Sequence, residues 1–160
     1  MKFIMILLSV LSLSLQAEEL TEREKLSINK YLAERASTLE AVEYAGGREF
    51  LSGSLSKKNE KILAMLYTLE GFKKGNNYYF FLVVFSRTES GLAFLSDSLV
   101  GGKGSRTLSF KSMGNSLIEF TSKFSLPGDP QCCPTGEGTA IFYVNSRGKL
   151  RELNVSPKMP

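Results

Sequence analysis

The chain has 160 residues, a net charge of +4 and no histidine. A Ser-His-Asp triad and a Cys-His pair are therefore excluded, and the commonest general base is missing. Lysines and arginines are scattered along the sequence and form no stripe with interleaved aromatic residues, which argues against nucleic-acid binding. We expect a protein that is not an enzyme and that has no nucleic-acid partner.

The opening residues, MKFIMILLSVLSLSLQA, have the pattern of a secretory signal peptide. Lys2 supplies the positive charge, an apolar stretch follows, and Ala17 is the small residue before the expected cleavage. The stretch is too short and too poorly flanked to be a membrane anchor, and no cysteine follows it directly for a lipoprotein cut. We expect residues 1–17 to be removed and the mature protein to be periplasmic or secreted by a bacterium, without an integral membrane anchor.

Residues 18–42 carry the strongest helical pattern. Thr21 and Glu24 have the spacing of a capping box, and apolar residues recur at helical spacing after them. We expect this helix to pack on a sheet and the Gly46-Gly47 pair to end this part of the chain.

From residue 49 onward the pattern indicates strands. Residues 77–85 (NYYFFLVVF) are apolar on both faces, which is typical of a central strand, and residues 61–69 are strongly apolar. Residues 116–124 alternate between apolar and polar side chains, which predicts one solvent-exposed face, and a hairpin turn at Gly114-Asn115 should precede them. The other expected strands are residues 50–54, 91–96, 106–113, 139–144 and 149–153.

The predicted fold is mainly β, an antiparallel sandwich or curved meander with an N-terminal helix, and an α+β arrangement is its variant. The β domain is expected to span residues 43–155. Residues 100–105 (VGGKGS) read as a flexible link, because they lack the spacing of a phosphate-binding loop. Residues 156–160 are expected to be a loose tail.

Residues 126–144 hold both cysteines, Cys132 and Cys133, and three of the five prolines. Adjacent Cα atoms lie about 3.8 Å apart, whereas ordinary disulfides need about 4.4–6.8 Å, so a bond between these two would be strained and more easily reduced. Pro130 and Pro134 stiffen the backbone on either side. An oxidising compartment would favour the bond over free thiols.

Three interpretations of the cysteine pair remain open. The pair is structural, as a vicinal disulfide or as packed thiols; it is a redox-labile sensor; or it belongs to a metal site. Only Asp129 and Glu137 lie nearby as carboxylates, so zinc is poorly supported, and we expect no metal and no cofactor. The candidate site is Cys132 and Cys133 with the residues that support their loop: Asp129, Pro130, Pro134 and Thr135.

The stretch from Gly128 to Thr135, GDPQCCPT, resembles a family of uncharacterised exported bacterial β-rich proteins that carry a GDP-x-CCP-[ST] loop near their end. Upstream segments resemble the same family, namely residues 44–48, 66–71, 75–78 and 82–85. Members often carry a GDLNGDG segment suggestive of calcium, but here residues 53–60 read GSLSKKNE, without the aspartates that a hard cation needs. The resemblance implies fold and exported location rather than an activity.

For function, we expect an exported, non-enzymatic binding or envelope-associated protein. It would contact a partner protein or small ligand through loops that connect strands, including the cysteine loop. The alternative is a thiol-redox responder in which Cys132 and Cys133 cycle between disulfide and dithiol. A purely structural envelope component is the third hypothesis.

Overall fold

The computed structural model describes residues 19–55, 60–131 and 133–157, so the signal peptide expected at residues 1–17 lies outside the described residues. The described part forms two four-stranded sheets, ordered β1-β2-β3-β4 (sheet A) and β5-β6-β7-β8 (sheet B), in which every paired neighbour is antiparallel. The predicted mainly β fold with an N-terminal helix is confirmed. Its elements are α1 (Glu22–Thr38), β1 (Val42–Leu55), β2 (Glu60–Glu70), the short helix η1 (Phe72–Lys74), β3 (Tyr78–Thr88), β4 (Gly91–Gly102), β5 (Arg106–Gly114), β6 (Leu117–Phe124), β7 (Gly136–Val144) and β8 (Leu150–Pro157).

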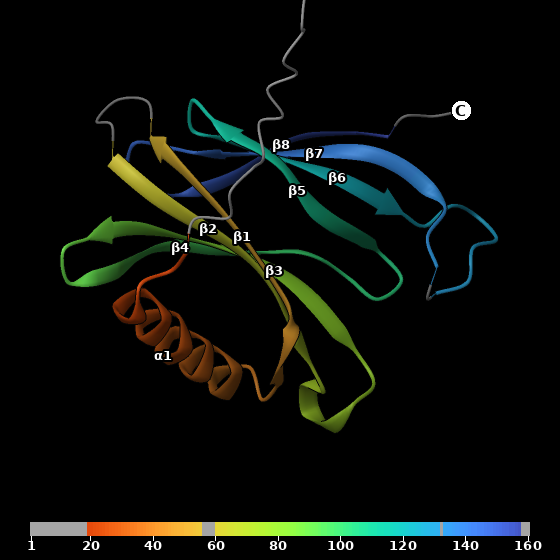
Figure 1. Ribbon diagram of the computed structural model, residues 1–160. Helices are drawn as coiled ribbons and strands as arrows, with labels where there is room; N and C mark the ends of the chain where they lie inside the picture. Colours follow the sequence, from red (N-terminus) through yellow and green to blue (C-terminus); the bar gives the residue numbers. More distant parts are fainter. Residues whose placement is uncertain (1–18, 56–59, 132, 158–160) are drawn as a thin grey trace, which may run out of the picture.

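Helix α1, sheet A and sheet B form three layers, with sheet A in the middle (Figure 1). Alternate side chains of β2 face opposite layers: Leu63 and Met65 pack with the buried residues of α1, whereas Ile62 and Ala64 pack with those of sheet B. A middle layer must be apolar on both faces, because neither face meets water. This confirms the prediction that residues 77–85 belong to a central strand, since β3 is buried from Phe81 to Ser86, and the strongly apolar β2 beside it is almost continuously buried.

Helix α1 is shorter than the expected residues 18–42. Its capping box is formed: the Thr21 hydroxyl accepts from the Glu24 N–H at 3.2 Å, and the Glu24 carboxylate accepts from the Thr21 N–H at 2.9 Å. At the other end Glu40 takes a left-handed φ of 50°, and the Ala41 N–H donates to the Ala36 carbonyl at 3.0 Å. A left-handed residue with such a bond closes a helix, so Val42 already belongs to β1.

Strand β1 begins well before the expected residue 50, and Gly46-Gly47 does not separate helix from strands. The glycines lie in a bulge, where residues 45–48 of β1 face a single residue of β2. A Cβ at Gly47 would lie 2.7 Å from the Thr68 hydroxyl oxygen, so the close approach of the two strands requires glycine there. A bulge absorbs extra residues without ending the strand, which is why the glycine pair misled the prediction.

Three smaller expectations are also corrected. Residues 100–102 belong to β4, in which Gly101 pairs with Phe80 and Gly102 with Tyr79 of β3. Both glycines lie against backbone oxygens where a Cβ would not fit. The β5–β6 turn is centred on Asn115 and Ser116, which both have positive φ, as a tight hairpin requires. Residues 156 and 157, expected in the loose tail, pair with β7 as part of β8, and residues 158–160 lie outside the described residues.

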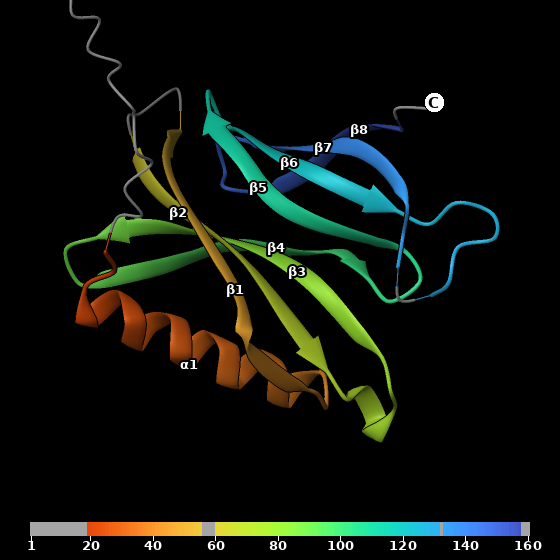
Figure 2. The same ribbon diagram turned by 45° about the vertical axis from the view of Figure 1, so that its right-hand side comes forward.

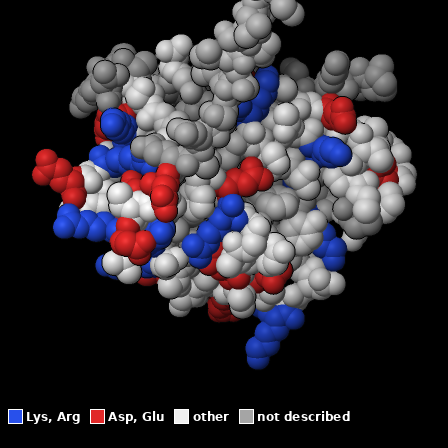
Figure 3. Space-filling model, in the orientation of Figure 1, with Lys and Arg blue, Asp and Glu red and all other residues white. Residues whose placement is uncertain are grey.

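The outer face of sheet A carries α1, while no described helix or strand covers the outer face of sheet B in either ribbon view (Figures 1 and 2). Strand β6 shows the predicted alternation: Ile118 and Phe120 are buried between the sheets, whereas Thr121 is exposed on the outer face. Acidic and basic side chains are interspersed on the face shown in Figure 3. Among the described residues, no helix has the length and apolar character needed to cross a membrane.

Candidate functional site

Residues 125–135, which we call the cysteine loop, join the end of β6 to the start of β7. The loop projects beyond the ends of these strands at one edge of the molecule (Figure 2). Most of its described residues are exposed, including Cys133. Exposed loops that a rigid sheet positions are common places for binding residues.

The Asp129 carboxylate holds the two ends of the cysteine loop together. One of its oxygens accepts from the backbone N–H groups of Leu126 and Thr135, each at 2.8 Å, and the other accepts from the Thr135 hydroxyl at 2.8 Å. These hydrogen bonds, first those from the backbone of Leu126 and Thr135 and then that from the hydroxyl, lower the pKa of Asp129 below its ordinary value of 3.8. The loop is thus closed around one ionised side chain.

The prolines act on the cysteine loop through its backbone. The Cys133 N–H donates to the Pro130 carbonyl at 3.0 Å, which holds Cys133 close to Pro130. A turn precedes Pro130, where the Asp129 N–H donates to the Leu126 carbonyl at 3.0 Å and Gly128 has a φ of 96°. Pro134 is half-buried just before Thr135. The structure therefore brings Asp129 and Thr135 into contact and holds the described cysteine beside them.

The state of the cysteine pair stays a prediction, because Cys132 lies outside the described residues. Within the described part of the chain there is no free cysteine. Nor does that part contain a group of three or more acidic or cysteine side chains that could hold a metal ion. Glu137, the second carboxylate near the cysteines in the sequence, is exposed at the start of β7 and makes none of the loop's hydrogen bonds.

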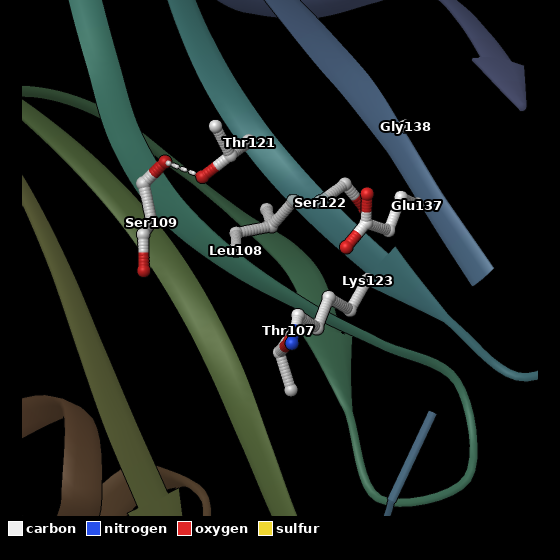
Figure 4. Close-up of a pocket in the computed structure, with 8 residues that line it drawn as sticks. All are labelled: Thr107, Leu108, Ser109, Thr121, Ser122, Lys123, Glu137 and Gly138. Atoms are coloured by element: carbon white, nitrogen blue, oxygen red, sulfur yellow. Dashed lines mark hydrogen bonds between the residues drawn. The ribbon is translucent and has the colours of Figure 1, made fainter. Parts of the chain in front are cut away.

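A hollow of about 270 Å³ lies at the base of the cysteine loop, on the ends of three strands of sheet B (Figure 4). In the register of the sheet, Thr107 faces Lys123 and Lys123 faces Glu137, while Ser109 faces Thr121 in the next row. Side chains two positions apart on a strand share a face. The lining residues are Thr107, Leu108, Ser109, Thr121, Ser122, Lys123, Glu137 and Gly138.

Lys123 and Glu137 are cross-strand neighbours of opposite charge, yet no ion pair within 4.0 Å joins them among the contacts of the described residues. In Figure 4, Lys123 extends toward Thr107 and Glu137 extends over Ser122. The sequence predicted neither the hollow nor the pairing of these residues. They flank a loop of eleven residues, and only the strand register reveals that they are opposite each other.

A second hollow, of about 540 Å³, lies at the start of α1 and is larger but more open than the first. Its most buried charges are already paired, since the Arg87 guanidinium lies 2.9 Å from the Glu24 carboxylate. The same carboxylate also caps α1. We therefore assign these charges to the attachment of α1 to β3 rather than to a ligand.

A polar network fastens the middle of α1 to sheet A. The Tyr31 hydroxyl donates to the Asp97 carboxylate at 3.0 Å and shares a 3.0 Å hydrogen bond with the Tyr67 hydroxyl. Arg35 forms an ion pair with Asp97 at 2.8 Å. Burial, followed by the hydrogen bond with Tyr67, raises the pKa of Tyr31 well above its ordinary value. Its members are joined to one another across the contact between α1 and sheet A, so we assign the network a structural role.

No family model matches the chain, and no solved structure matches it. The chain is similar over 44 residues to the protein named "Putative lipoprotein LppP" of Mycobacterium bovis and of Mycobacterium tuberculosis, with 36% identity in both. The similar segment is 28% of this chain and 25% of each relative. The chain thus matches about a quarter of the length of these curated relatives.

Proposed function

We propose that this protein is an exported, non-enzymatic binding module of the bacterial cell envelope that presents the cysteine loop to a partner. The exported location is supported by the signal-peptide pattern of residues 1–17, and by the name lipoprotein that the similar mycobacterial proteins carry. The absence of histidine from the sequence supports a function without acid–base catalysis at neutral pH.

The observation that carries the binding role is the closure of an exposed loop around Asp129. Three hydrogen bonds of 2.8 Å fix the loop before any partner arrives. A loop that is ordered in advance loses less conformational entropy on binding, which favours affinity. The described residues of the loop are half-buried or exposed, so they are not part of the hydrophobic core. Packing in the core therefore does not explain the conformation of the loop.

The test is site-specific photocrosslinking in intact cells of the source bacterium. A photoreactive phenylalanine analogue replaces Gln131, which is exposed in the cysteine loop, or Ser146, which is exposed in the turn between β7 and β8. We expect a discrete crosslinked species from position 131 and none of that size from position 146. An identical pattern from both positions, or no product from either, would overturn the proposal.

The Asp129→Asn substitution supplies the specificity control for this experiment. It keeps the size of the side chain but removes the charge that accepts the three hydrogen bonds. We expect the crosslinked species from position 131 to fall several-fold while the circular dichroism of the purified protein stays unchanged. A crosslink that does not respond to Asp129→Asn would mean that the loop's shape is irrelevant to the contact.

The exposure of Cys133 favours a thiol-redox responder as the second candidate function. A disulfide between Cys132 and Cys133 would lie in an exposed and strained position, and such bonds are the more easily reduced ones. Intact mass after alkylation, without reductant and then with mild reductant, tests this and reports the cleavage site as well. Labelling that requires strong reductant would remove the redox hypothesis, whereas ready labelling after mild reduction would support it.

A further inference from the structure

We infer that the hollow beside the cysteine loop binds a neutral, hydroxyl-rich glycan; this rests on the proposed binding function and names its ligand. The hollow is built from the ends of β5, β6 and β7. It adjoins the loop directly, because Lys123 lies next to the last residue of β6 and Glu137 is the second residue of β7. A ligand in the hollow would therefore also reach the base of the loop.

The first argument is a comparison within sheet B. On the same outer face, Lys111 and Glu119 form an ion pair, with 3.3 Å between the ammonium nitrogen and the carboxylate oxygen. Lys123 and Glu137 stand directly opposite each other in the register but form no such pair. The hollow thus holds a donor and an acceptor that are both available to a ligand, whereas the charges farther along the sheet satisfy each other.

The second argument is the chemistry of the lining. The Ser109 hydroxyl donates to the Glu49 carboxylate at 3.4 Å and the Thr121 hydroxyl donates to the Ser109 carbonyl at 3.3 Å, so both offer a ligand their lone pairs as acceptors. The Thr107 hydroxyl can donate and accept, while Lys123 only donates and Glu137 only accepts. The formal charges of the lining cancel, so the hollow does not select a cation or an anion. Sugar hydroxyls likewise both donate and accept, and a neutral glycan can satisfy all of these groups without burying a charge of its own.

The third argument is size. The volume of the hollow, about 270 Å³, is slightly smaller than that of pockets for drug-sized ligands, which is roughly 300–1,000 Å³. It is open, and Leu108 is the one apolar side chain among the residues that line it, so the rest of its apolar surface comes from the carbon atoms of the other lining residues. One ring of a longer chain would fit the hollow, and the rest of the glycan would run along the outer face of sheet B.

The experiment is a titration of the ¹⁵N-labelled exported protein, followed by ¹H–¹⁵N spectra, with chitotetraose and with maltotetraose as two neutral glycans. We expect saturable shifts of the amides of Thr107, Thr121, Lys123 and Glu137 with at least one of them. Lys123→Met and Glu137→Gln should each weaken binding by about tenfold, the effect of one hydrogen bond to a charged group. The matched controls Lys111→Met and Glu119→Gln, which alter the paired charges on the same face, should leave the affinity unchanged.

Two results would overturn the glycan inference. One is that neither glycan shifts these amides up to its solubility limit; if the zwitterionic dipeptide alanylalanine shifts them instead, the hollow binds charge. The other is that the control variants weaken binding as much as those in the hollow. If the glycan inference fails while the crosslink from position 131 persists, the proposed binding function stands with another ligand. If only the crosslink fails, the proposed role of the cysteine loop in partner binding is refuted and the glycan site stands.

Discussion

The Tyr31 hydroxyl on α1 and the Asp97 carboxylate on β4, 66 positions apart in the chain, are joined by a hydrogen bond of 3.0 Å. Tyr31 also contacts the hydroxyl of Tyr67, which is fully buried, and its ring stacks on Phe94 with centroids 5.6 Å apart. One residue of the helix thereby contacts three residues on β2 and β4. The attachment of α1 to sheet A depends on this tyrosine as well as on its apolar contacts.

We predict that Tyr31→Phe lowers the free energy of unfolding by about 1–3 kcal/mol, because it removes two hydrogen bonds beneath the helix while leaving the ring in place. Urea denaturation followed by circular dichroism measures the change. Tyr44→Phe is the control, since Tyr44 is 54% exposed, and it should cost much less. Equal costs for the two substitutions would mean that the hydroxyl of Tyr31 contributes nothing to the attachment.

The closure of the cysteine loop should depend on pH in a defined direction. The pKa of Asp129 is lowered below 3.8 by its hydrogen bonds in the folded protein, so the stabilisation by its charge is complete above about that pH. As the pH falls through the lower, folded-state pKa, the carboxylate takes up a proton and the stabilisation is lost. The loop should therefore stay closed from neutral pH down to about 3.8 and open only in stronger acid.

Amide chemical shifts measured against pH test this prediction. The amides of Leu126 and Thr135 should move together below about pH 3.8, and Asp129→Asn should abolish that movement. The amides of Arg147 and Lys149 provide a control, because the neutral side-chain oxygen of Asn145 accepts from them at 2.8 and 3.0 Å. A common transition in both pairs would indicate general acid unfolding rather than titration of Asp129.

The bulge in β1 predicts a cost for adding a methyl group at Gly47. Its Cβ would lie 2.7 Å from the Thr68 hydroxyl oxygen and 3.1 Å from the Tyr44 ring. We expect Gly47→Ala to destabilise the protein by about 1–3 kcal/mol, the usual cost of overpacking, as measured by urea denaturation. Gly114→Ala is the matched control, because no atom lies within 4 Å of its would-be Cβ.

A second substitution separates crowding at Gly47 from loss of backbone flexibility. Thr68→Ala removes the oxygen that the new Cβ would meet, so part of the Gly47→Ala cost should disappear in the Thr68→Ala background. Strictly additive costs in the double variant would show that the two side chains do not interact and that another cause must be sought.

The two sheets share a buried hydroxyl bridge at Ser96. Its oxygen donates to the Gly148 carbonyl at 2.6 Å and accepts from the Leu150 N–H at 3.1 Å, so β4 of sheet A is bonded to the β7–β8 hairpin of sheet B. Ser96→Ala would leave both backbone groups without this partner, and we expect a loss of about 1–3 kcal/mol in thermal or urea denaturation. Ser98→Ala, which loses only a 3.4 Å contact, should be close to neutral.

The sequence was most informative where burial is uniform. The apolar residues of β3 predicted a central strand, because a strand that is covered on both faces has an apolar residue at nearly every position. The prediction was wrong where glycines serve a close approach: Gly47 sits in a bulge and Gly102 lies against Tyr79. In the sequence alone, where the residues that approach these glycines are not visible, such glycines suggest turns or flexible links.

For the candidate site, the sequence drew attention to Asp129 and Thr135 through the motif around the cysteines, and the structure gives the pair a physical role as the closure of the loop. The sequence did not reveal the hollow, because it depends on Lys123 and Glu137 facing each other from two strands. A period-two pattern tells which face a side chain occupies, but the partner opposite it is set by the register.

In the described part of the chain, each sheet is assembled from strands that follow one another along the sequence. Every pairing can therefore form as a hairpin as soon as its second strand is available, and no strand has to wait for a distant partner. Folds dominated by such local pairings form faster than sandwiches whose strands cross between sheets. During folding, this order leaves few unpaired strand edges exposed at any one time, which lowers the risk of aggregation.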